Sequence, residues 1–512
     1  MELNRLLFPG EYDGGPFEGI DVSRIVNDGR KITPGSLFIC HEGKNYNSHV
    51  LLPQLKEAGC VAAVAARAYA EIDVGVPLLK IADTRRAEAF IASRFSGDPG
   101  KRLILIGVTG TNGKTSVATM IRHILNEAGI RAAMIGTTGY VGDTGNENAF
   151  ARFHAGEAAT MTTPPPLTLY PLLAAMSDAG ITHVVMEVSS QALDQARVAP
   201  LSFACSVFTN LSPEHLDYHR DMNAYLQAKK ILFQQTECAV VNGDTPWTDL
   251  LLEGLSCRRV NCGSVGDRDL QATDIRFDGS EGVSFVLQTE DGRFPVSIPI
   301  PGAFTVQNAL LAIAAAREVG VDLCAAVGAL PRLPTVPGRM EKIDTGDLPF
   351  SVLIDYAHTE AALRSLLLSV RGFRRPGERI VLLFGCGGDR DPAKRAAMGR
   401  TAAELADYTL VTSDNSRSED PKKIIREILS GMPDHTRRRV IVDREKAIRY
   451  AIGSAQPGDI VLLVGKGHET YEIGRDGIKA FDEKKIVREA LKERRNGHTT
   501  EDGNADRNGI SD

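Results

Sequence analysis

The stretch Leu103–Ser116, LILIGVTGTNGKTS, joins a run of branched apolar residues to a glycine-rich turn that carries Lys114 and Thr115. The run Leu103–Val108 has the continuous apolar character of a strand that is buried on both faces of a parallel sheet. From Lys114 onward, apolar residues recur at three- and four-residue spacing, and Gly129 supplies a C-terminal stop. The stretch therefore predicts a buried strand, a turn and a helix in that order.

The turn has the chemistry of a phosphate cradle. Between a strand and a helix, successive backbone N–H groups and the positive helix end face an anion, while Lys114 adds a charge and Thr115 a hydroxyl for Mg²⁺. The pattern G-x-x-x-x-G-K-[ST] would place its first glycine at Val108, but the glycines stand at 107, 110 and 113. An ordinary glycine-rich connection is the alternative. The order of strand, Gly-Lys-Thr and helix favours nucleotide binding, with Lys114 facing solvent when no nucleotide is bound.

Composition predicts a large globular protein of about three domains, at roughly 150 residues each. The chain has 512 residues, of which 43% are apolar and 24% charged. A net charge of −6 and a pI near 6.1 argue against a nucleic-acid partner. Eight cysteines without a C-x-x-C pair indicate neither a zinc site nor a disulfide framework. Without a signal peptide or an apolar run of about 18 residues, we expect a cytoplasmic protein with no membrane span.

The order of motifs predicts an α/β fold in several domains. Short strands such as Leu37–Cys40 and Cys60–Ala66 precede a linker-like cluster at 96–100. Alternating residues around Asp291-Gly292 predict a β-hairpin, and Gly302–Gly320 predicts a helix. Pro331–Pro337 contains three prolines and predicts a second linker. The predicted divisions are 1–99, 100–335 and 336–493, followed by a polar tail, 494–512, that we expect to be disordered.

Three features of the central segment favour metal or phosphate chemistry. The predicted strand Ile181–Val188 ends with Glu187, and a carboxylate at such a strand end beside a phosphate turn is where Mg²⁺ is held; helix capping is the alternative. A further strand, Phe203–Phe208, leads into TNLSPEHLDYH (209–219), whose two histidines and two acids exceed what an ordinary loop requires. In the next predicted helix, Lys229 falls near the apolar face, where it either snorkels to solvent or is chemically modified.

From residue 338 onward a second parallel sheet is predicted. The candidate strands are Ser351–Tyr356, Arg379–Phe384, Tyr408–Ser413, Arg439–Val442 and Asp459–Val464. Four of them run directly into polar segments: DYAH (355–358), GCGGDR (385–390), DNSR (414–417) and GKGHE (465–469). Since ligands bind beyond the carboxyl ends of parallel strands, these segments predict a binding site at one edge of the sheet.

The chain resembles the Mur ligase family over nearly its whole length. TGTNGKT, MEVSS, TNLSPEHLDYH, the helix with Lys229, DYAHT, FGCGGDRD and GKGHE occur in the family's order. The resemblance implies a UDP-binding N-terminal domain, a central P-loop-type ATPase domain and a C-terminal Rossmann-like domain for the incoming amino acid. It implies ATP- and Mg²⁺-dependent addition of meso-2,6-diaminopimelate to UDP-N-acetylmuramoyl-L-alanyl-D-glutamate through an acyl phosphate. That reaction belongs to peptidoglycan synthesis, and thus to cell-wall biogenesis, cell shape and division. A monomer is expected.

The resemblance also implies roles for individual residues. It implies that the ATP phosphates are bound by Gly110, Thr111, Asn112, Gly113, Lys114, Thr115 and Ser116, and that Asn308 also lies near the nucleotide. The alternative for Asn308 is that it is merely exposed, as polar residues in the middle of a helix often are. The UDP-muramoyl substrate is expected to be bound by Ser23, Thr162, Thr163, Ser189, Gln195 and Arg197. Diaminopimelate is expected to be bound by Arg390, Asp414, Asn415, Ser416, Arg417, Gly465 and Glu469. Magnesium is expected to be bound by Thr115, Glu187, His215 and a carbamylated Lys229, and Lys114, His215 and Lys229 are expected to have catalytic roles.

One departure from the family pattern concerns the amino acid. The family signature for diaminopimelate is D-N-P-R, and here Ser416 replaces the proline. An L-lysine-adding Mur ligase and a folylpolyglutamate-type ligase are therefore the nearest alternatives, and a P-loop kinase or a nucleotide-dependent binding module is the alternative from another class. Arg417 favours diaminopimelate over lysine, because its fork matches the second carboxylate of diaminopimelate.

Overall fold

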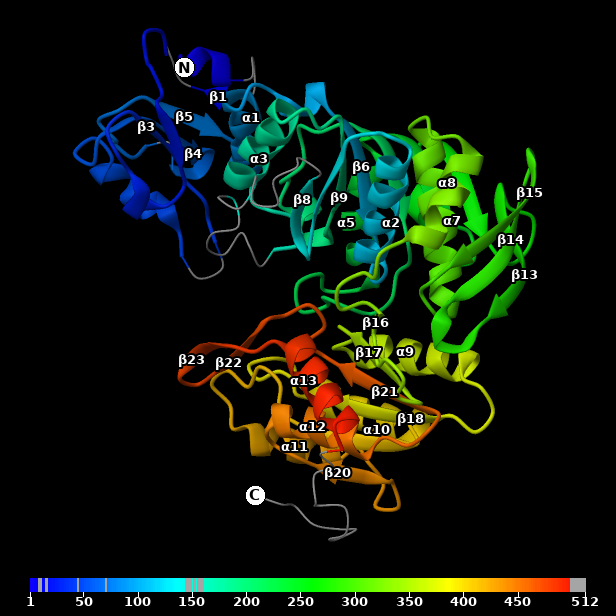
Figure 1. The fold of residues 1–512 in the computed structure, drawn as a ribbon. Helices are drawn as coiled ribbons and strands as arrows, with labels where there is room; N and C mark the ends of the chain where they lie inside the picture. The colour runs from blue at the N-terminus through cyan, green and yellow to red at the C-terminus, as the bar shows by residue number, and fades with distance from the viewer. Residues whose placement is uncertain are drawn as a thin grey trace. The chain divides into compact units, whose positions relative to one another are not determined.

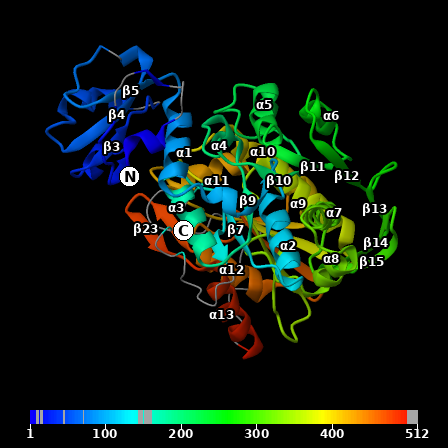
Figure 2. The same cartoon turned by 90° about the horizontal axis from the view of Figure 1, so that it is seen from above.

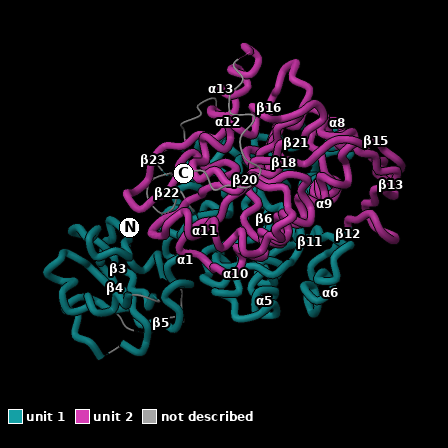
Figure 3. The backbone as a smooth tube through the Cα atoms, turned by 90° about the horizontal axis from the view of Figure 1, so that it is seen from below, with its two compact units in different colours: residues 1–261, 311–326 teal, residues 262–310, 327–512 magenta. Residues whose placement is uncertain are grey.

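The computed structural model describes residues 1–7, 12–13, 17–43, 46–69, 71–142, 150, 153 and 161–497. The chain divides into two compact units, residues 1–261 with 311–326 and residues 262–310 with 327–512 (Figure 3). Both units combine parallel-rich sheets with helices, which confirms the predicted α/β class (Figure 1). In the described part of the chain, no helix combines the length and apolar character that crossing a membrane requires.

The first unit begins with a small sheet that contains the two strands predicted near the N-terminus. Its strands, in the order β1-β5-β4-β3-β2, are β1 Tyr12–Asp13, β2 Arg24–Val26, β3 Ser36–Ile39, β4 Cys60–Ala66 and β5 Leu78–Ile81. Only β1 is antiparallel to its neighbour. Helix α1, Thr84–Phe95, follows, and Asp83 caps it by accepting from the N–H groups of Arg85 and Arg86.

A larger sheet carries the glycine-rich turn of the first unit. The strands are β6 Ile104–Thr109, β7 Ala132–Gly136, β8 Gly139–Gly142, β9 His183–Glu187, β10 Phe203–Phe208, β11 Thr236–Asn242 and β12 Arg258–Gly263. Their order is β12-β11-β10-β6-β9-β7-β8. The helices are α2 Lys114–Glu127, α3 Pro166–Asp178, α4 Ser190–Asp194, α5 Met222–Phe233 and α6 Trp247–Leu252. The predicted strand-turn-helix is thus confirmed as β6 and α2.

The central strand β6 is packed between helices, with α2 and α5 on opposite sides of the sheet (Figure 2). Gly107 lies in the middle of β6, and a Cβ there would stand 3.0 Å from Leu232 and 3.1 Å from Phe203. The absence of a side chain at Gly107 therefore lets α5 approach the strand closely. On the same core, Ala89 and Ala92 of α1 pack with residues of α3 and α5, so the N-terminal helix is part of this packing.

The second unit begins with antiparallel strands β13 Leu270–Phe277, β14 Val283–Thr289 and β15 Gly292–Ile298. Thr289 pairs with Gly292 across the tight turn, which confirms the predicted hairpin. Along the chain follow α7 Ala303–Glu318, which confirms the predicted helix, and α8 Leu323–Ala329.

The C-terminal sheet contains all five strands predicted after residue 338. Its order is β16-β17-β21-β18-β19-β20, with β16 Glu341–Ile343, β17 Ser351–Asp355, β18 Arg379–Phe384, β19 Tyr408–Val411, β20 Arg438–Val440 and β21 Asp459–Val464. Every pair except β16–β17 is parallel. The helices are α9 Glu360–Phe373, α10 Ala393–Leu405, α11 Pro421–Leu429, α12 Arg444–Ser454 and α13 Glu483–Arg495.

Two features of this part were not predicted. The hairpin of β22 Tyr471–Gly474 and β23 Gly477–Ala480 follows the GKGHE segment. Helix α13 continues to Arg495, so Arg494 and Arg495, which were assigned to the polar tail, belong to this helix. Residues 498–512 of that tail lie outside the described residues. The other predicted domain limits stay predictions.

Candidate functional site

The glycine-rich turn connects β6 to α2 in a conformation that needs glycine. Gly110 and Gly113 have φ angles of 147° and 85°, and a Cβ at Gly110 would collide with Thr209 Oγ1. Lys114 is half-buried, and its Nζ donates to the carbonyl oxygens of Gly110 at 3.0 Å and Thr111 at 2.8 Å. The amine therefore folds over its own turn, and the expectation that it faces solvent is wrong, because the turn's carbonyls offer it two hydrogen bonds.

Glu187 ends β9, and its side chain is fully buried. Its Oε2 accepts from Thr115 Oγ1 at 3.0 Å and from Thr137 Oγ1 at 3.2 Å, and its Oε1 accepts from Thr137 N at 3.0 Å. The register of β6 and β9 pairs Val108 with Glu187, which brings the carboxylate to the start of the turn. Among the described residues, no lysine or arginine forms an ion pair with Glu187. A buried carboxylate without a cationic side-chain partner is an oxygen ligand suited to a divalent cation.

Lys229 of α5 is 1% exposed, so its predicted alternative, snorkelling to solvent, is wrong. Its Nζ donates to the Gly110 carbonyl oxygen at 2.9 Å and lies 4.3 Å from the ring centroid of Tyr225. Burial and the nearby Lys114 charge hold the pKa of Lys229 well below its usual value, and Glu214 opposes them only in part. A buried amine, whose charged form is disfavoured by burial, is therefore positioned directly behind the phosphate turn.

The two histidines of the 209–219 segment have different surroundings. His219 is 5% exposed, its Nε2 lies 2.8 Å from Ser190 Oγ, and its ring stacks on Tyr225. The His215 side chain is 47% exposed, and burial of the rest of the ring lowers its pKa while Glu214 opposes the shift. Within the described residues, no three His, Cys, Asp or Glu side chains form a cluster that could hold a metal ion. The structure thus gives His219 a packing role and leaves the His215 ring open to solvent.

Five of the six residues expected to bind the UDP-muramoyl substrate gather near Glu187. They are Thr162, Thr163, Ser189, Gln195 and Arg197. Arg197 Nη1 donates to the Thr163 carbonyl oxygen at 2.6 Å, and Nη2 donates to Gln195 Oε1 at 2.7 Å. Thr163 Oγ1 donates to the Glu187 carbonyl oxygen at 2.9 Å and accepts from Ser189 N at 3.0 Å. A continuous series of hydrogen bonds therefore joins the Arg197 guanidinium to the end of β9.

The remaining predicted residues of this part lie elsewhere. Ser23 is exposed, and its Oγ donates to the Pro34 carbonyl oxygen at 3.3 Å. Among the described residues it forms no hydrogen bond with the group around Arg197. Asn308 of α7 is 6% exposed, so the reading of this residue as merely surface-exposed is wrong. Its predicted nucleotide contact stays a prediction.

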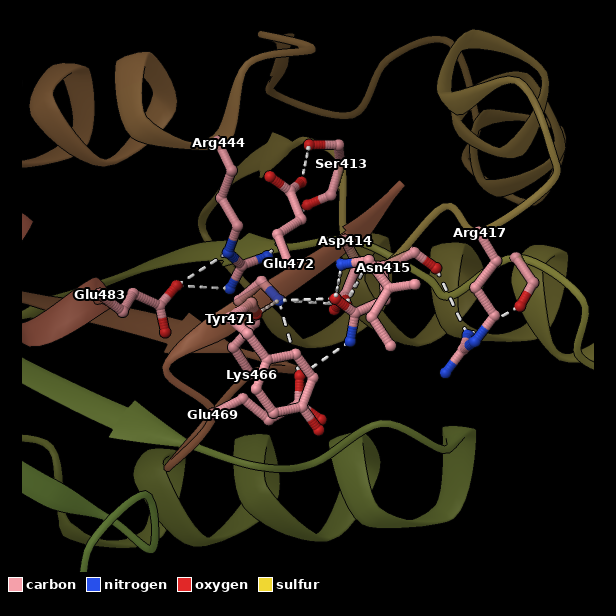
Figure 4. A network of polar contacts seen from close by, with 12 residues as sticks. Ser413, Asp414, Asn415, Arg417, Arg444, Lys466, Glu469, Tyr471, Glu472 and Glu483 are labelled. Carbon is pink, nitrogen blue, oxygen red and sulfur yellow. Dashed lines mark hydrogen bonds and ion pairs between the residues drawn. The ribbon is translucent and has the colours of Figure 1, made fainter. Parts of the chain in front are cut away.

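The residues expected to bind the amino acid meet in the second unit, beyond the carboxyl ends of β19 and β21 (Figure 4). Asn415 Nδ2 donates to Glu469 Oε2 at 2.8 Å, and Lys466 Nζ donates to Asn415 Oδ1 at 2.9 Å. Gly465 has a φ of 115°, and a Cβ there would stand 2.7 Å from Asp414 Oδ2. The glycine therefore lets the GKGHE segment approach the DNSR segment.

The buried Arg444 lies close to Asp414, and its positive charge acts on the Asp414 carboxylate. Arg444 Nη2 donates to the Val464 carbonyl oxygen at 3.0 Å, and Nη1 donates to the Ser413 carbonyl oxygen at 3.2 Å. Its ion pair with Glu483, at 2.7 Å, is also buried. Burial raises the pKa of Asp414, but the Arg444 and Lys466 charges, the Asn415 backbone hydrogen bond and the His358 charge together outweigh burial and hold this pKa below its usual value. Asp414 is thus an ionised carboxylate at the site.

Arg417 adopts a left-handed backbone conformation, with a φ of 51°. Its backbone N donates to the Ile473 carbonyl oxygen at 3.0 Å, and Nη1 donates to the Gly388 carbonyl oxygen at 2.8 Å. Ser416 is 9% exposed, whereas Arg390 is exposed on the neighbouring segment. These contacts hold the Arg417 backbone against β22 and one nitrogen of its guanidinium against the GCGGDR segment.

A charged cluster that was not predicted from the sequence connects the GCGGDR segment (385–390) to the residues that follow the DNSR segment (414–417). The fully buried Arg395 side chain donates to Glu419 at 2.7 Å and to Glu427 at 2.6 Å. Glu419 also accepts from Asp389 N at 2.7 Å, and Ser418 Oγ donates to Asp389 Oδ1 at 2.6 Å. The signal in the sequence was weak, because an arginine in a predicted helix is normally taken as exposed. Arg444 was missed for the same reason, whereas Lys466 and Thr137 lie outside helices and bond partners that are far away in sequence.

Two features define the class of this protein. One parallel sheet carries a phosphate turn with a buried carboxylate beside it, and a second parallel sheet carries a polar edge. Together they are the features of a nucleotide-dependent α/β enzyme. Residues 108–316 match the Mur ligase middle domain, and residues 338–467 match the Mur ligase glutamate ligase domain. The chain belongs to the Mur ligase family.

Full-length relatives show the same family. The UDP-N-acetylmuramoyl-L-alanyl-D-glutamate--2,6-diaminopimelate ligase of Syntrophomonas wolfei subsp. wolfei is 39% identical over 495 residues, covering 94% of this chain and 97% of the relative. The ligase of the same name from Geobacillus thermodenitrificans is 40% identical over 511 residues, covering 97% and 100%. A solved structure of a UDP-N-acetylmuramoyl-L-alanyl-D-glutamate--2,6-diaminopimelate ligase has a TM-score of 0.67 and 31% identity, covering 93% of this chain and 95% of that one.

The same fold occurs in a nucleotide complex. A MurF ligase from Thermotoga maritima in complex with ADP has a TM-score of 0.59 at 17% identity, covering 93% of this chain and all of that one. At this identity the likeness concerns the fold alone. The predicted class of a three-domain α/β ligase is confirmed by the family and by the fold of these neighbours.

Proposed function

We propose that this protein is an ATP-dependent ligase that adds meso-2,6-diaminopimelate to UDP-N-acetylmuramoyl-L-alanyl-D-glutamate in peptidoglycan precursor synthesis. The observation that carries the proposal is the group of Asn415, Arg417 and Glu469 at the edge of a parallel sheet, in a chain 39–40% identical along nearly its full length to ligases of that name. The N-terminal, central and C-terminal parts would then bind UDP, ATP and the amino acid, with limits at 1–99, 100–335 and 336–493.

The chemistry explains why such an enzyme needs a phosphate turn. A carboxylate does not condense with an amine in water, so the γ-phosphate of ATP is transferred to the D-glutamyl carboxylate. The diaminopimelate amine attacks the resulting acyl phosphate, an amide forms, and phosphate leaves. Catalysis of such steps is mostly positioning and charge stabilisation. The Lys114 amine and the backbone N–H groups at the start of α2 are suited to that task, whereas the N–H groups of Thr111 and Asn112 already donate to Asn210.

The residues around Glu187 fit a magnesium ion. The fit rests on the buried Glu187 carboxylate, which has hydroxyl and N–H donors but no cationic partner among the described residues, and on the neighbouring Thr115 hydroxyl. We propose that Thr115, Glu187, His215 and a modified Lys229 hold it. Bound Mg²⁺ would neutralise phosphate charge.

Carbamylation would make Lys229 such a ligand. The neutral amine attacks CO₂, a nitrogen–carbon bond forms, a proton is released, and an oxygen-bearing carbamate replaces the amine. The depressed pKa of Lys229 supports this step, because only the unprotonated amine is nucleophilic. We expect Lys229→Ala to lose ligase activity and to regain part of it with added short carboxylates, while Lys230→Ala keeps activity. An unmodified intact mass together with a failed rescue would contradict the modification.

The choice of amino acid rests on Arg417. Diaminopimelate carries a distal carboxylate that lysine lacks, and a guanidinium fork offers it two parallel, charge-assisted hydrogen bonds. Glu469 lies nearby and can accept from the distal ammonium group. A site built around such a pair rejects an analogue without the partner group by as much as about 10⁴-fold. We therefore propose a diaminopimelate-selective enzyme despite Ser416, since freeing one φ angle changes stability by only about 0.4–1 kcal/mol.

The residues near Arg197 and the exposed Ser23 would bind the UDP-linked substrate. The hydrogen-bonded series from Arg197 to Glu187 supports this proposal, because it places polar groups beside the site of phosphate transfer. We also propose that the enzyme acts as a monomer in the cytoplasm, where ATP is available. Light scattering of the purified protein tests the monomer.

A phosphate-release assay with an amino-acid panel tests the proposed function. Release should require ATP, UDP-N-acetylmuramoyl-L-alanyl-D-glutamate and diaminopimelate together, and mass spectrometry should show the tripeptide product. Preference for L-lysine would indicate the lysine-adding alternative. Release that needs no amino acid would indicate a kinase, and nucleotide binding without turnover would indicate a binding module; each result would overturn the proposal.

A further inference from the structure

Lys466, the second residue of GKGHE, is fully buried at the centre of the polar network in Figure 4. Its Nζ donates to Asn415 Oδ1 at 2.9 Å and to the Tyr471 carbonyl oxygen at 2.8 Å. The same nitrogen lies 3.5 Å from Glu469 Oε2 and 4.0 Å from Asp414 Oδ1. A single cation thus lies close to the buried carboxylate of Asp414, the partly buried carboxylate of Glu469 and one amide.

The contacts of Lys466 determine which way the Asn415 amide points. Asn415 Oδ1 accepts from Lys466 Nζ and also from Ile473 N, each at 2.9 Å. The oxygen side of the amide is therefore occupied by two donors, and Nδ2 is left to face Glu469, to which it donates at 2.8 Å. Loss of the lysine would remove the charged donor of this pair and weaken the preference for this orientation.

The charge of Lys466 also acts on Glu469. Burial raises the pKa of Glu469, and the Asn415 hydrogen bond and the Lys466 charge oppose that rise, whereas the Asp414 charge adds to it. The titratable groups that face Glu469 are Asp414, Lys466, Tyr356, whose Oη lies 3.5 Å from Oε1, and Tyr471. Lys466 is thus the cation among them, and without it the Asp414 and Glu469 carboxylates would lose the positive charge that lies close to both.

We propose that Lys466 is a positioning residue for the incoming amino acid: it keeps Glu469 ionised and the Asn415 amide oriented, so that Asn415 Nδ2 holds the Glu469 carboxylate, which receives the distal ammonium group of a diamino acid. The inference rests on the proposed function and extends it to a residue that touches no substrate. An ionised carboxylate accepts from an ammonium group, whereas a protonated Glu469 would offer a donor to it. Lys466 would therefore act on amino-acid affinity and on its pH dependence, with little effect on the later chemical step.

A purely structural role predicts a different outcome. Burying a carboxylate without its cation destabilises a protein wherever it occurs, but it need not change the affinity for one substrate. Arg379→Met supplies the matched control. Arg379 pairs with the buried Asp459 at 2.8 Å at the amino end of β18 and β21, the opposite end of the sheet from Lys466. That variant should lower the melting temperature and leave the KM for diaminopimelate unchanged.

The test compares pH profiles of kcat/KM for diaminopimelate in the full-length enzyme, Lys466→Met, Lys466→Gln and Arg379→Met, with UDP-dipeptide and ATP saturating. For both Lys466 variants we expect KM at pH 7 to rise at least about tenfold, with kcat within about threefold, and the acid limb to move up by at least about one pH unit. Lys466→Gln keeps hydrogen-bonding capacity without the charge, so an equal effect in both variants assigns that effect to the charge. Adding Glu469→Gln to either variant should abolish the shift of the acid limb.

Each result is decisive. If a Lys466 variant does not fold, as judged by its melting curve, the other variant carries the test; if neither folds, the residue is structural and the inference fails. Unmoved acid limbs in folded Lys466 variants, or an equal rise of KM in Arg379→Met, would also overturn it. Should the unmodified enzyme release no phosphate in response to diaminopimelate, the proposed function fails instead, and the two failures are distinguishable.

Discussion

Replacing Lys229 by methionine should abolish ligase activity and at the same time stabilise the first unit. The amine of Lys229 is buried, and its partners are the Gly110 carbonyl oxygen and the Tyr225 ring. A methionine fills a similar volume without a group that must lose its hydration or its proton on folding. Activity is lost because the proposed ligand to magnesium is gone. The opposite directions of the two effects distinguish a functional lysine from a stabilising one.

The expected magnitude follows from proton binding. The pKa of Lys229 in the folded protein lies well below its usual value, whereas the unfolded chain keeps its amine protonated up to about pH 10.4. Between these two pKa values the unfolded state binds one more proton, so stability rises with pH by about 1.4 kcal/mol per pH unit from this residue alone. Below the folded pKa that dependence ends and the penalty is constant. Lys229→Met removes the slope and gains most stability at the acidic end.

The single tryptophan of the chain, Trp247, makes the measurement specific. It lies in α6, which packs against α5, and its side chain contacts the core of the first unit. Urea unfolding followed by its fluorescence at pH 7, 8 and 9, in CO₂-free buffer without Mg²⁺, gives the slope for each variant. Lys230→Met removes a neighbouring lysine whose amine is exposed, and it should reproduce the wild-type slope. Equal slopes for wild type and Lys229→Met would refute the buried neutral amine.

Three further predictions concern other parts of the molecule. Lys114→Ala should shift the melting temperature by no more than about 2 °C and abolish ATP-dependent phosphate release, because the amine bonds carbonyls of its own turn; unfolding of the variant would make Lys114 structural. Arg395→Met should destabilise the protein by about 3–5 kcal/mol in denaturant unfolding and raise the KM for diaminopimelate, with partial recovery in Arg395→Lys, since it strands Glu419; an unchanged KM would contradict the positioning effect. Arg417→Ala should lose the preference for diaminopimelate over lysine in competition assays, while Ser416→Pro stays close to wild type; comparable kcat/KM values for the two amino acids in the unmodified enzyme would disprove the basis of both.

The strands and helices that position the site could be predicted because their sequences carry apolar runs or apolar periodicity. Leu105–Val108 and Ile380–Phe384 are continuous apolar runs that the structure buries in β6 and β18, whereas Ile104 at the start of β6 is exposed and departs from the predicted burial. The hairpin of β22 and β23 was missed, because the residues of β23, Gly477–Ala480, are all exposed and carry no apolar alternation. Local pattern therefore identifies elements that face a core and fails for those that do not.

Buried charges were missed for a different reason. From the sequence, Arg444 is expected to be an exposed residue at the start of a helix. Its charge can be buried because it forms an ion pair with Glu483, 39 residues further along the chain. Arg395 likewise depends on Glu419, 24 residues away. A single sequence contains both members of each pair but not the proximity that joins them. Such residues can be recognised only when the tertiary arrangement is known.

The arrangement of the amino-acid site depends on one topological feature that the chain order conceals. The last parallel strand, β21, lies between β17 and β18, so GKGHE emerges in the middle of the sheet edge and not at its end. The registers pair Val464 with both Asp355 and Phe384, and Phe384 with Val411, so the polar segments begin at one level. Lys466 therefore reaches Asn415, 51 residues away in sequence, at hydrogen-bond distance. From this central place the cation reaches Asp414, which follows β19 two positions away in the sheet, as well as Glu469 of its own segment.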